Sequence, residues 1–97
     1  MAKYVLAYKG GNVATTDEER QASMAAWGAF LGGLGDALVD AGNPFGPSAS
    51  VGDGAAANLS GYTIITAGSL DEATEKAKAA PVVGNGGGVD VYETIDM

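Results

Sequence analysis

The sequence contains no cysteine and no histidine, and only five of its 97 residues are basic. Without cysteine the chain can form neither a disulfide nor a thiolate nucleophile, so a small domain must draw its stability from packing or association. The usual zinc ligands and the Ser-His and Cys-His nucleophile pairs are excluded as well, together with the side chain best matched to proton transfer near pH 7. We therefore expect no metal site and no cofactor.

Positive charge is scarce and scattered along the chain. Twelve acidic residues against five basic ones give a formal net charge of −7, and the basic residues never cluster. Such a surface repels a phosphate backbone, so we expect no nucleic-acid partner. No apolar run approaches the roughly 18 residues that span a bilayer, and the N-terminus lacks a basic segment followed by an apolar one. We expect a cytoplasmic protein without a membrane partner.

The sequence does contain enough apolar character for one small core. Hydrophobic residues make up 46% and charged residues 18%, which is typical of a globular protein and not of a disordered one. No repeat or linker divides the chain, so we expect a single domain over residues 1–97. A chain of this length buries only about two-thirds of the surface that its unfolded form exposes, so its core is small and stabilises the fold by only a narrow margin.

Four segments have the patterning of strands. Lys3–Tyr8 and Gly61–Ala67 are apolar at both alternating sets of positions, which indicates burial on both faces. Pro47–Val51 is weaker and begins with proline, which suits an edge strand. Val89–Ile95 alternates apolar and polar residues, so one of its faces should be exposed to solvent.

Two segments have the signals of helices. Thr15–Thr16 precedes an acidic first turn, and apolar residues then recur every three or four positions until Gly-Asn-Pro at 42–44. That stripe comprises Met24, Trp27, Leu31, Leu34 and Leu38. The second helix should begin at a capping box over residues 69–72, bury a narrow stripe of mostly small residues and end before Pro81.

Two further pairs of residues on the first predicted helix lie outside its stripe. Gly28 and Gly35 flank it, which favours a close approach of the helix to the sheet. Asp36 and Asp40 are spaced i,i+4 on the opposite side. They could share a hard cation, but two carboxylates fall well short of a calcium site, so a solvated helix face is the preferred interpretation.

The order of these elements, βαββαβ, predicts a ferredoxin-like α+β fold with an antiparallel sheet. Right-handed crossovers put both helices on one face of the sheet and leave the other face bare. The two central strands of this topology are the two that are apolar on both faces. A bare apolar sheet face is larger than monomers usually expose, so we expect a second copy to cover it in a homodimer that forms a dimeric α/β barrel.

The chain from Lys3 to Ile95 resembles the YCII-related family, which includes the DGPF-type proteins. The residues that carry the resemblance are KYVLAY, WGAFLGGL, AGNPFGPS, SGYTII, SLDEATEKAKAAP and GGGVDVYE. The family's fold is the same dimeric α/β barrel. Some members are built around a His on the first helix and an Asp before a Pro after the second helix. The resemblance puts Trp27 and Ala80 at these positions, and neither side chain can move a proton.

The resemblance implies a ligand cleft between the first helix and the sheet. Trp27 would lie in it with Tyr8, Phe30 and Tyr62 nearby, and such an aromatic lining suits a small, flat, largely apolar ligand. The helical spacing of Trp27 and Phe30 is equally that of core residues.

Ser60 and Asp53 bracket the polar loop before the third strand predicted above. If any residue does acid or base work, Asp53 with a hydroxyl from Tyr8 or Tyr62 is the candidate, since an apolar pocket can raise a carboxyl pKa. The alternative is that Asp53-Gly54 simply forms a turn.

Three functions follow. The first is a small-molecule-binding or catalytically diverged homodimeric module that lacks the family His-Asp pair. The second, implied by the resemblance alone, is a lyase or isomerase acting on a small organic acid or lactone through Asp53 and Tyr62. The third is an interaction module in a larger complex, which no residue pattern in the sequence supports.

Overall fold

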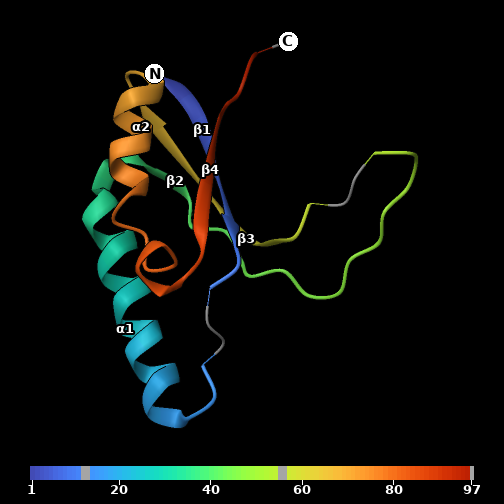
Figure 1. Cartoon of the computed structure of the whole chain (residues 1–97). Helices are drawn as coiled ribbons and strands as arrows, with labels where there is room; N and C mark the ends of the chain where they lie inside the picture. Colours follow the sequence, from blue (N-terminus) through green and yellow to red (C-terminus); the bar gives the residue numbers. More distant parts are fainter. Residues whose placement is uncertain (12–13, 55–56, 97) are drawn as a thin grey trace.

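The computed structural model describes residues 1–11, 14–54 and 57–96. Its order is βαββαβ with two short 3-10 segments, as Figure 1 shows. The elements are β1 (Ala2–Lys9), α1 (Asp17–Leu34), η1 (Gly35–Ala37), β2 (Leu38–Asp40), β3 (Leu59–Ala67), α2 (Leu70–Ala77), η2 (Val83–Asn85) and β4 (Gly88–Glu93). No helix in the described ranges is long and apolar enough to cross a membrane.

The four strands form one sheet in the order β2-β3-β1-β4, and every pairing is antiparallel. The two strands that are apolar on both faces, β1 and β3, are the central ones. Leu6 lies opposite Thr63 on one side and Val91 on the other. This arrangement confirms the predicted ferredoxin-like α+β fold.

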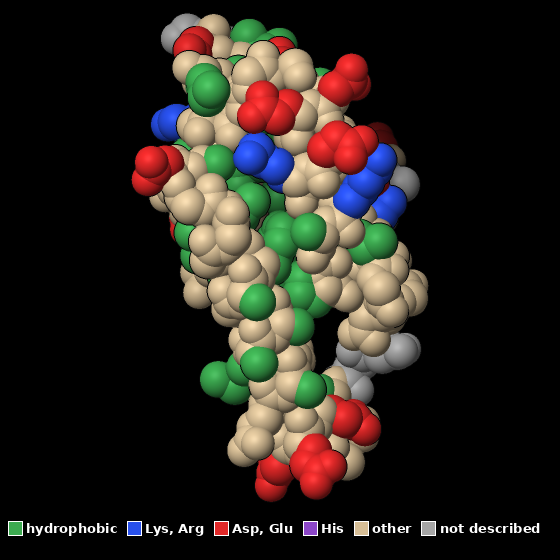
Figure 2. Space-filling model, turned by 90° about the vertical axis from the view of Figure 1, so that its left-hand side faces the viewer, with side chains coloured by type: hydrophobic (Ala, Val, Ile, Leu, Met, Phe, Trp, Pro, Cys, Tyr) green, Lys and Arg blue, Asp and Glu red, His purple; other side chains and the backbone are tan. Residues whose placement is uncertain are grey.

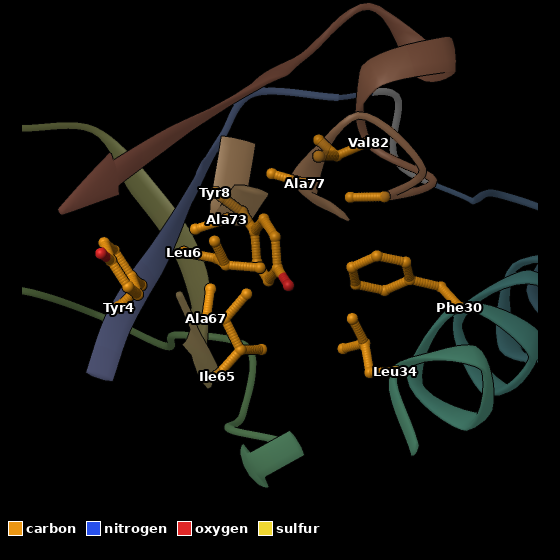
Figure 3. Close-up of a cluster of buried hydrophobic side chains, with 11 residues drawn as sticks. Tyr4, Leu6, Tyr8, Phe30, Leu34, Ile65, Ala67, Ala73, Ala77 and Val82 are labelled. Carbon is orange, nitrogen blue, oxygen red and sulfur yellow. The ribbon is translucent and has the colours of Figure 1, made fainter. Parts of the chain in front are cut away.

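The core lies between the sheet and both helices. The sheet contributes alternate residues of β1, namely Tyr4, Leu6 and Tyr8, and α1 contributes Phe30 and Leu34. Figure 3 shows these side chains converging with Ile65 and Ala67 of β3 and Ala73 and Ala77 of α2. Both helices therefore cover the same face of the sheet, as predicted, and Figure 1 shows them together on one side.

The first helix ends earlier than predicted. It stops at Leu34 because Gly35 takes a φ of 54°, a left-handed conformation that glycine adopts at little cost. Leu38, the last residue of the predicted stripe, instead begins β2 and pairs with Ile65. Asp36 and Asp40 therefore do not share a helix face, because Asp36 lies in η1 and Asp40 in β2.

The strand predicted over Pro47–Val51 is also wrong. These residues lie outside the strands, and Val51 is 97% exposed. The second strand is β2, which occupies the edge beside β3 that Pro47–Val51 was expected to fill. The prediction was wrong because Leu38, three residues past Gly35, still matched the helical spacing of the apolar stripe and was assigned to the helix.

Only the C-terminal half of α1 packs on the core. Phe30 and Leu34 are buried, whereas Met24 is 74% exposed. A Cβ at Gly28 would meet nothing within 4 Å, so the predicted close approach at this glycine does not occur. The N-terminal half of α1 extends past the end of the sheet (Figure 1).

The predicted helix starts are confirmed in detail. The Thr16 side chain accepts a hydrogen bond from the Glu19 N–H, and Ser69 accepts one from the Glu72 N–H at 3.1 Å. The Glu72 carboxylate reaches back one residue further than in an ordinary capping box, to the N–H of Gly68. On α2 the small residues Ala73 and Ala77 are buried, as their spacing predicted.

Candidate ligand-binding site

An open cavity of about 890 Å³ lies beneath the N-terminal half of α1, and we call it the α1 cavity. Its floor is the end of β1 and the start of β3, and its walls are α1 and the segments that follow β1, β2 and α2. Figure 2 shows a hollow beside the lower, N-terminal part of α1. The lining residues are Tyr8, Gly10, Gly11, Ala14, Glu19, Ala22, Ser23, Ala26, Trp27, Leu31, 41–44, 60–63, Pro81, Val82 and Asn85.

The floor of the cavity carries two linked hydrogen bonds, one buried and one partly buried. The Tyr8 hydroxyl lies 2.7 Å from Thr63 Oγ1, and Thr63 Oγ1 lies 3.0 Å from the carbonyl oxygen of Ala41. Because a carbonyl can only accept, the Thr63 hydroxyl donates to Ala41 and must accept from Tyr8. Register explains the contact, since β1 and β3 pair antiparallel and place Tyr8 and Thr63 on the same face.

Trp27 forms the aromatic side of the cavity. Its ring packs edge-on against Tyr8 with centroids 4.9 Å apart, and against Phe30 with centroids 5.9 Å apart. Trp27 is partly buried and lines the cavity, whereas Phe30 is buried behind it in the core. Of the two interpretations, pocket lining therefore applies to Trp27 and core packing applies to Phe30.

A second aromatic pair lies at the β2 edge of the sheet. The Tyr62 ring stacks on Phe45 with centroids 5.8 Å apart. The Tyr62 hydroxyl donates to Asp40 Oδ2 at 3.3 Å. Asp40 also accepts from the N–H of Gly42 through its other oxygen, at 2.9 Å. The hydroxyl of Tyr62 therefore points to a carboxylate of β2 at the edge of the sheet.

Gly42 shapes the wall that follows β2. Its φ is +74°, and a Cβ built there would overlap the carbonyl oxygen of Tyr62. Only glycine lets the backbone pass so close to β3 with a left-handed conformation. This close approach is what brings Asn43 and Pro44 to the cavity wall.

The charge of the α1 cavity comes from one carboxylate. Glu19 Oε2 accepts hydrogen bonds from the Thr15 N–H at 2.8 Å and from the Thr15 hydroxyl at 3.2 Å. These bonds hold the pKa of Glu19 below its ordinary value. Among the described lining residues there is no Lys and no Arg.

The tyrosine on the floor is not a candidate base at neutral pH. Burial raises the pKa of Tyr8 above its ordinary value of 10.0, which outweighs the opposite effect of its hydrogen bond with Thr63. The phenol therefore stays protonated. Within the described part of the chain, no group of three or more His, Cys, Asp or Glu side chains is placed to hold a metal ion.

The structure brings together four of the residues that the sequence indicated. Tyr8, Trp27, Ser60 and Tyr62 all line the α1 cavity. Asp53 does not, because it lies exposed on the segment between β2 and β3, outside the cavity lining. The carboxylate that Tyr62 contacts is Asp40.

Several lining residues had no signal in the sequence that pointed to a site. Thr63 read only as a β-branched strand residue, and Glu19 as a residue favourable to the helix dipole. Pro81 marked the end of a helix. Antiparallel pairing of the two central strands was the available clue, since it places Gly61 opposite Tyr8 and Thr63 beside it.

A family model for the YCII-related domain matches residues 1–97. The chain belongs to the YCII-related family. No curated protein and no solved structure matches it with statistical significance. The two positions that the resemblance assigned to the YCII-type His-Asp pair lie near the α1 cavity, with Trp27 in its wall and Ala80 buried directly before the lining residue Pro81.

Proposed function

We propose that this YCII-related protein binds a small, flat organic molecule in the α1 cavity. The observation that carries the proposal is the cavity itself, whose volume of about 890 Å³ lies within the range of small-molecule sites. Its wall presents the ring of Trp27, held edge-on by Tyr8. Aromatic walls with a few convergent polar groups are typical of pockets that take planar ligands.

Binding fits the lining residues better than proton transfer does. The ionisable side chains among the described lining residues are Glu19, Tyr8 and Tyr62. The pKa of Glu19 is lowered and that of Tyr8 is raised, so both are moved away from neutral pH. A general acid or base works best when its pKa lies near the operating pH. These shifts support a binding module that has diverged from any His-Asp chemistry.

We propose further that two copies pair through the helix-free face of the sheet. This face comprises the residues that alternate with the core residues: Lys3, Val5, Ala7 and Lys9 of β1, Tyr62, Ile64 and Thr66 of β3, and Asp90 and Tyr92 of β4. Its centre is apolar, and the Lys9–Asp90 ion pair of 2.8 Å lies at its border. An apolar centre inside a charged rim is the usual anatomy of a protein interface.

The binding proposal is tested by fluorescence, because Trp27 is the only tryptophan of the chain. Single-ring aromatic compounds such as phenethyl alcohol do not absorb where tryptophan is excited selectively. We expect them to change Trp27 emission in a saturable way and to raise the melting temperature. No saturable change at millimolar concentration across a broad set of such compounds would refute the proposal.

A cavity-filling variant localises the binding. Ala26 lines the cavity and is exposed on α1, while the neighbouring Ala25 is exposed but does not line it. We expect Ala26→Phe to weaken binding by about tenfold or more, because the new ring occupies the ligand volume. Ala25→Phe makes the same chemical change on the same helix and should leave the affinity unchanged.

A further inference from the structure

The buried hydroxyl groups on the floor of the α1 cavity are committed to partners within the protein. Tyr8 donates to Thr63, and Thr63 donates to the Ala41 carbonyl. The second direction is forced, because a carbonyl can only accept, and the first follows from it. Each of these hydroxyl oxygens therefore has only lone pairs left for a ligand.

The oxygen of Tyr8 is the one that lies beside the aromatic wall of the cavity. The residue is 5% exposed, and its ring lies against Trp27. Figure 3 shows its hydroxyl directed from the sheet toward α1. A ligand stacked beside Trp27 meets an acceptor at this point, and it loses the water that would otherwise satisfy its own polar group. A buried polar group without a partner is costly, so the ligand's polar group must be a hydrogen-bond donor.

The negative charge of the cavity favours the same kind of ligand as its hydrogen-bond acceptors do. Glu19 is held as a carboxylate by Thr15, and the described lining residues include no cation. The whole chain carries a formal net charge of −7. Several lining side chains carry donor groups, namely Ser23, Trp27, Asn43, Ser60 and Asn85, but none of them is charged. An anionic ligand would thus be desolvated without a compensating cation.

We infer that the α1 cavity selects neutral or cationic aromatic ligands that donate a hydrogen bond to the Tyr8 oxygen, such as aromatic alcohols and amines, and that it rejects aromatic carboxylates. This inference rests on the proposed function and specifies its ligand class. The selection is made by acceptors that the fold orients, because the Tyr8 proton is already taken by Thr63. It is a case of specificity obtained by leaving the wrong ligand's polar group unmatched.

Four probes with one phenyl ring separate the two contributions. Phenethyl alcohol is a neutral donor, phenethyl methyl ether is a neutral acceptor, phenethylamine is a cationic donor, and hydrocinnamate is an anion. Titration of Trp27 emission at constant ionic strength gives each affinity. We expect the alcohol to bind about fivefold more tightly than the ether, which is the effect of one net hydrogen bond. Hydrocinnamate should bind about tenfold or more weakly than the amine.

The role of the Tyr8 oxygen is tested with Tyr8→Phe, which keeps the ring beside Trp27. In this variant the alcohol and the ether should bind equally, so the fivefold ratio is lost. Tyr92→Phe is the matched control, because Tyr92 is an exposed tyrosine of β4 outside the cavity lining, and the ratio should survive there. Urea unfolding of each variant shows that the fold is retained.

The outcomes distinguish the inference from the proposed function. If hydrocinnamate binds as well as phenethylamine, or if the ether matches the alcohol in the unmodified protein, the ligand class is wrong while binding in the cavity stands. If Tyr8→Phe retains the alcohol preference, the Tyr8 oxygen is not the acceptor and the inference is overturned. If no probe changes Trp27 emission, both the inference and the proposed function are wrong.

Discussion

Gly42 shows how one residue places a wall of the α1 cavity. It combines a φ of +74° with a position against the Tyr62 carbonyl oxygen, where a Cβ cannot be accommodated. Its N–H donates to Asp40, the carboxylate that also accepts from the Tyr62 hydroxyl. A side chain at this position would therefore disturb the turn and the rim of the cavity together.

We predict that Gly42→Ala lowers the free energy of unfolding by about 2 kcal/mol or more, because the methyl group meets rigid backbone and the left-handed conformation is strained. Urea unfolding followed by circular dichroism measures the loss. Gly46→Ala is the control, since a Cβ there meets nothing within 4 Å and its φ is not positive. We expect that control to change stability by less than about 0.5 kcal/mol. Equal effects of the two substitutions would contradict this account of the turn.

The hydrogen-bonded floor also belongs to the residue scale, and it shows a limit of the sequence. Tyr8 and Thr63 are 55 positions apart, and each residue alone is an ordinary strand residue. Nothing in either local pattern indicates that one hydroxyl fixes the proton of the other. The pairing depends on the register of β1 with β3, which is a tertiary property.

The element that departs most from sequence expectation is α1. Gly28 and Gly35 were expected to allow a close approach to the sheet, yet a Cβ at either would meet nothing within 4 Å, and the same is true of Gly33. Gly35 has a different role, because its φ of 54° ends the helix and releases Leu38 into β2. The same residue type thus destabilises α1 at some positions and terminates it at another.

We predict that Gly28→Ala and Gly33→Ala each stabilise the protein by up to about 1 kcal/mol, because alanine loses less backbone entropy in a helix and nothing obstructs its methyl group. The melting temperature and urea midpoint should both rise. Gly35→Ala should lower them instead, since an alanine must adopt a left-handed conformation. A loss of stability on Gly28→Ala would mean that another surface packs on this helix.

At the scale of the whole molecule, the sheet has helices on one face only. Val5 and Ile64 lie opposite each other in the pairing of β1 with β3, at the centre of the helix-free face. Tyr92 lies beside Val5 in β4 and is 58% exposed. A domain of this size gains from burying these side chains against a second copy, because its own core is small.

We predict that the protein sediments as a dimer at micromolar concentration and that Ile64→Asp converts it to a monomer. In a two-fold interface each copy would bury the new carboxylate near its symmetry mate, which is strongly unfavourable. Val83→Asp makes a comparable change at an exposed residue of η2, a segment outside the sheet, and should leave the dimer intact. A monomeric unmodified protein would refute the proposed pairing.

The sequence by itself determined the element types of β1, β3, β4 and α2, the start of α1 and, through the order βαββαβ, the ferredoxin-like sheet. These follow from local chemistry, namely alternation of apolar residues, capping side chains and helix stop signals. Only the tertiary structure decided that Leu38–Asp40 forms the edge strand, that Asp53 lies outside the cavity, and that the Tyr8 hydroxyl donates to Thr63. Those features depend on which distant segments pair, and a local pattern does not encode the partner of a strand or a hydroxyl group.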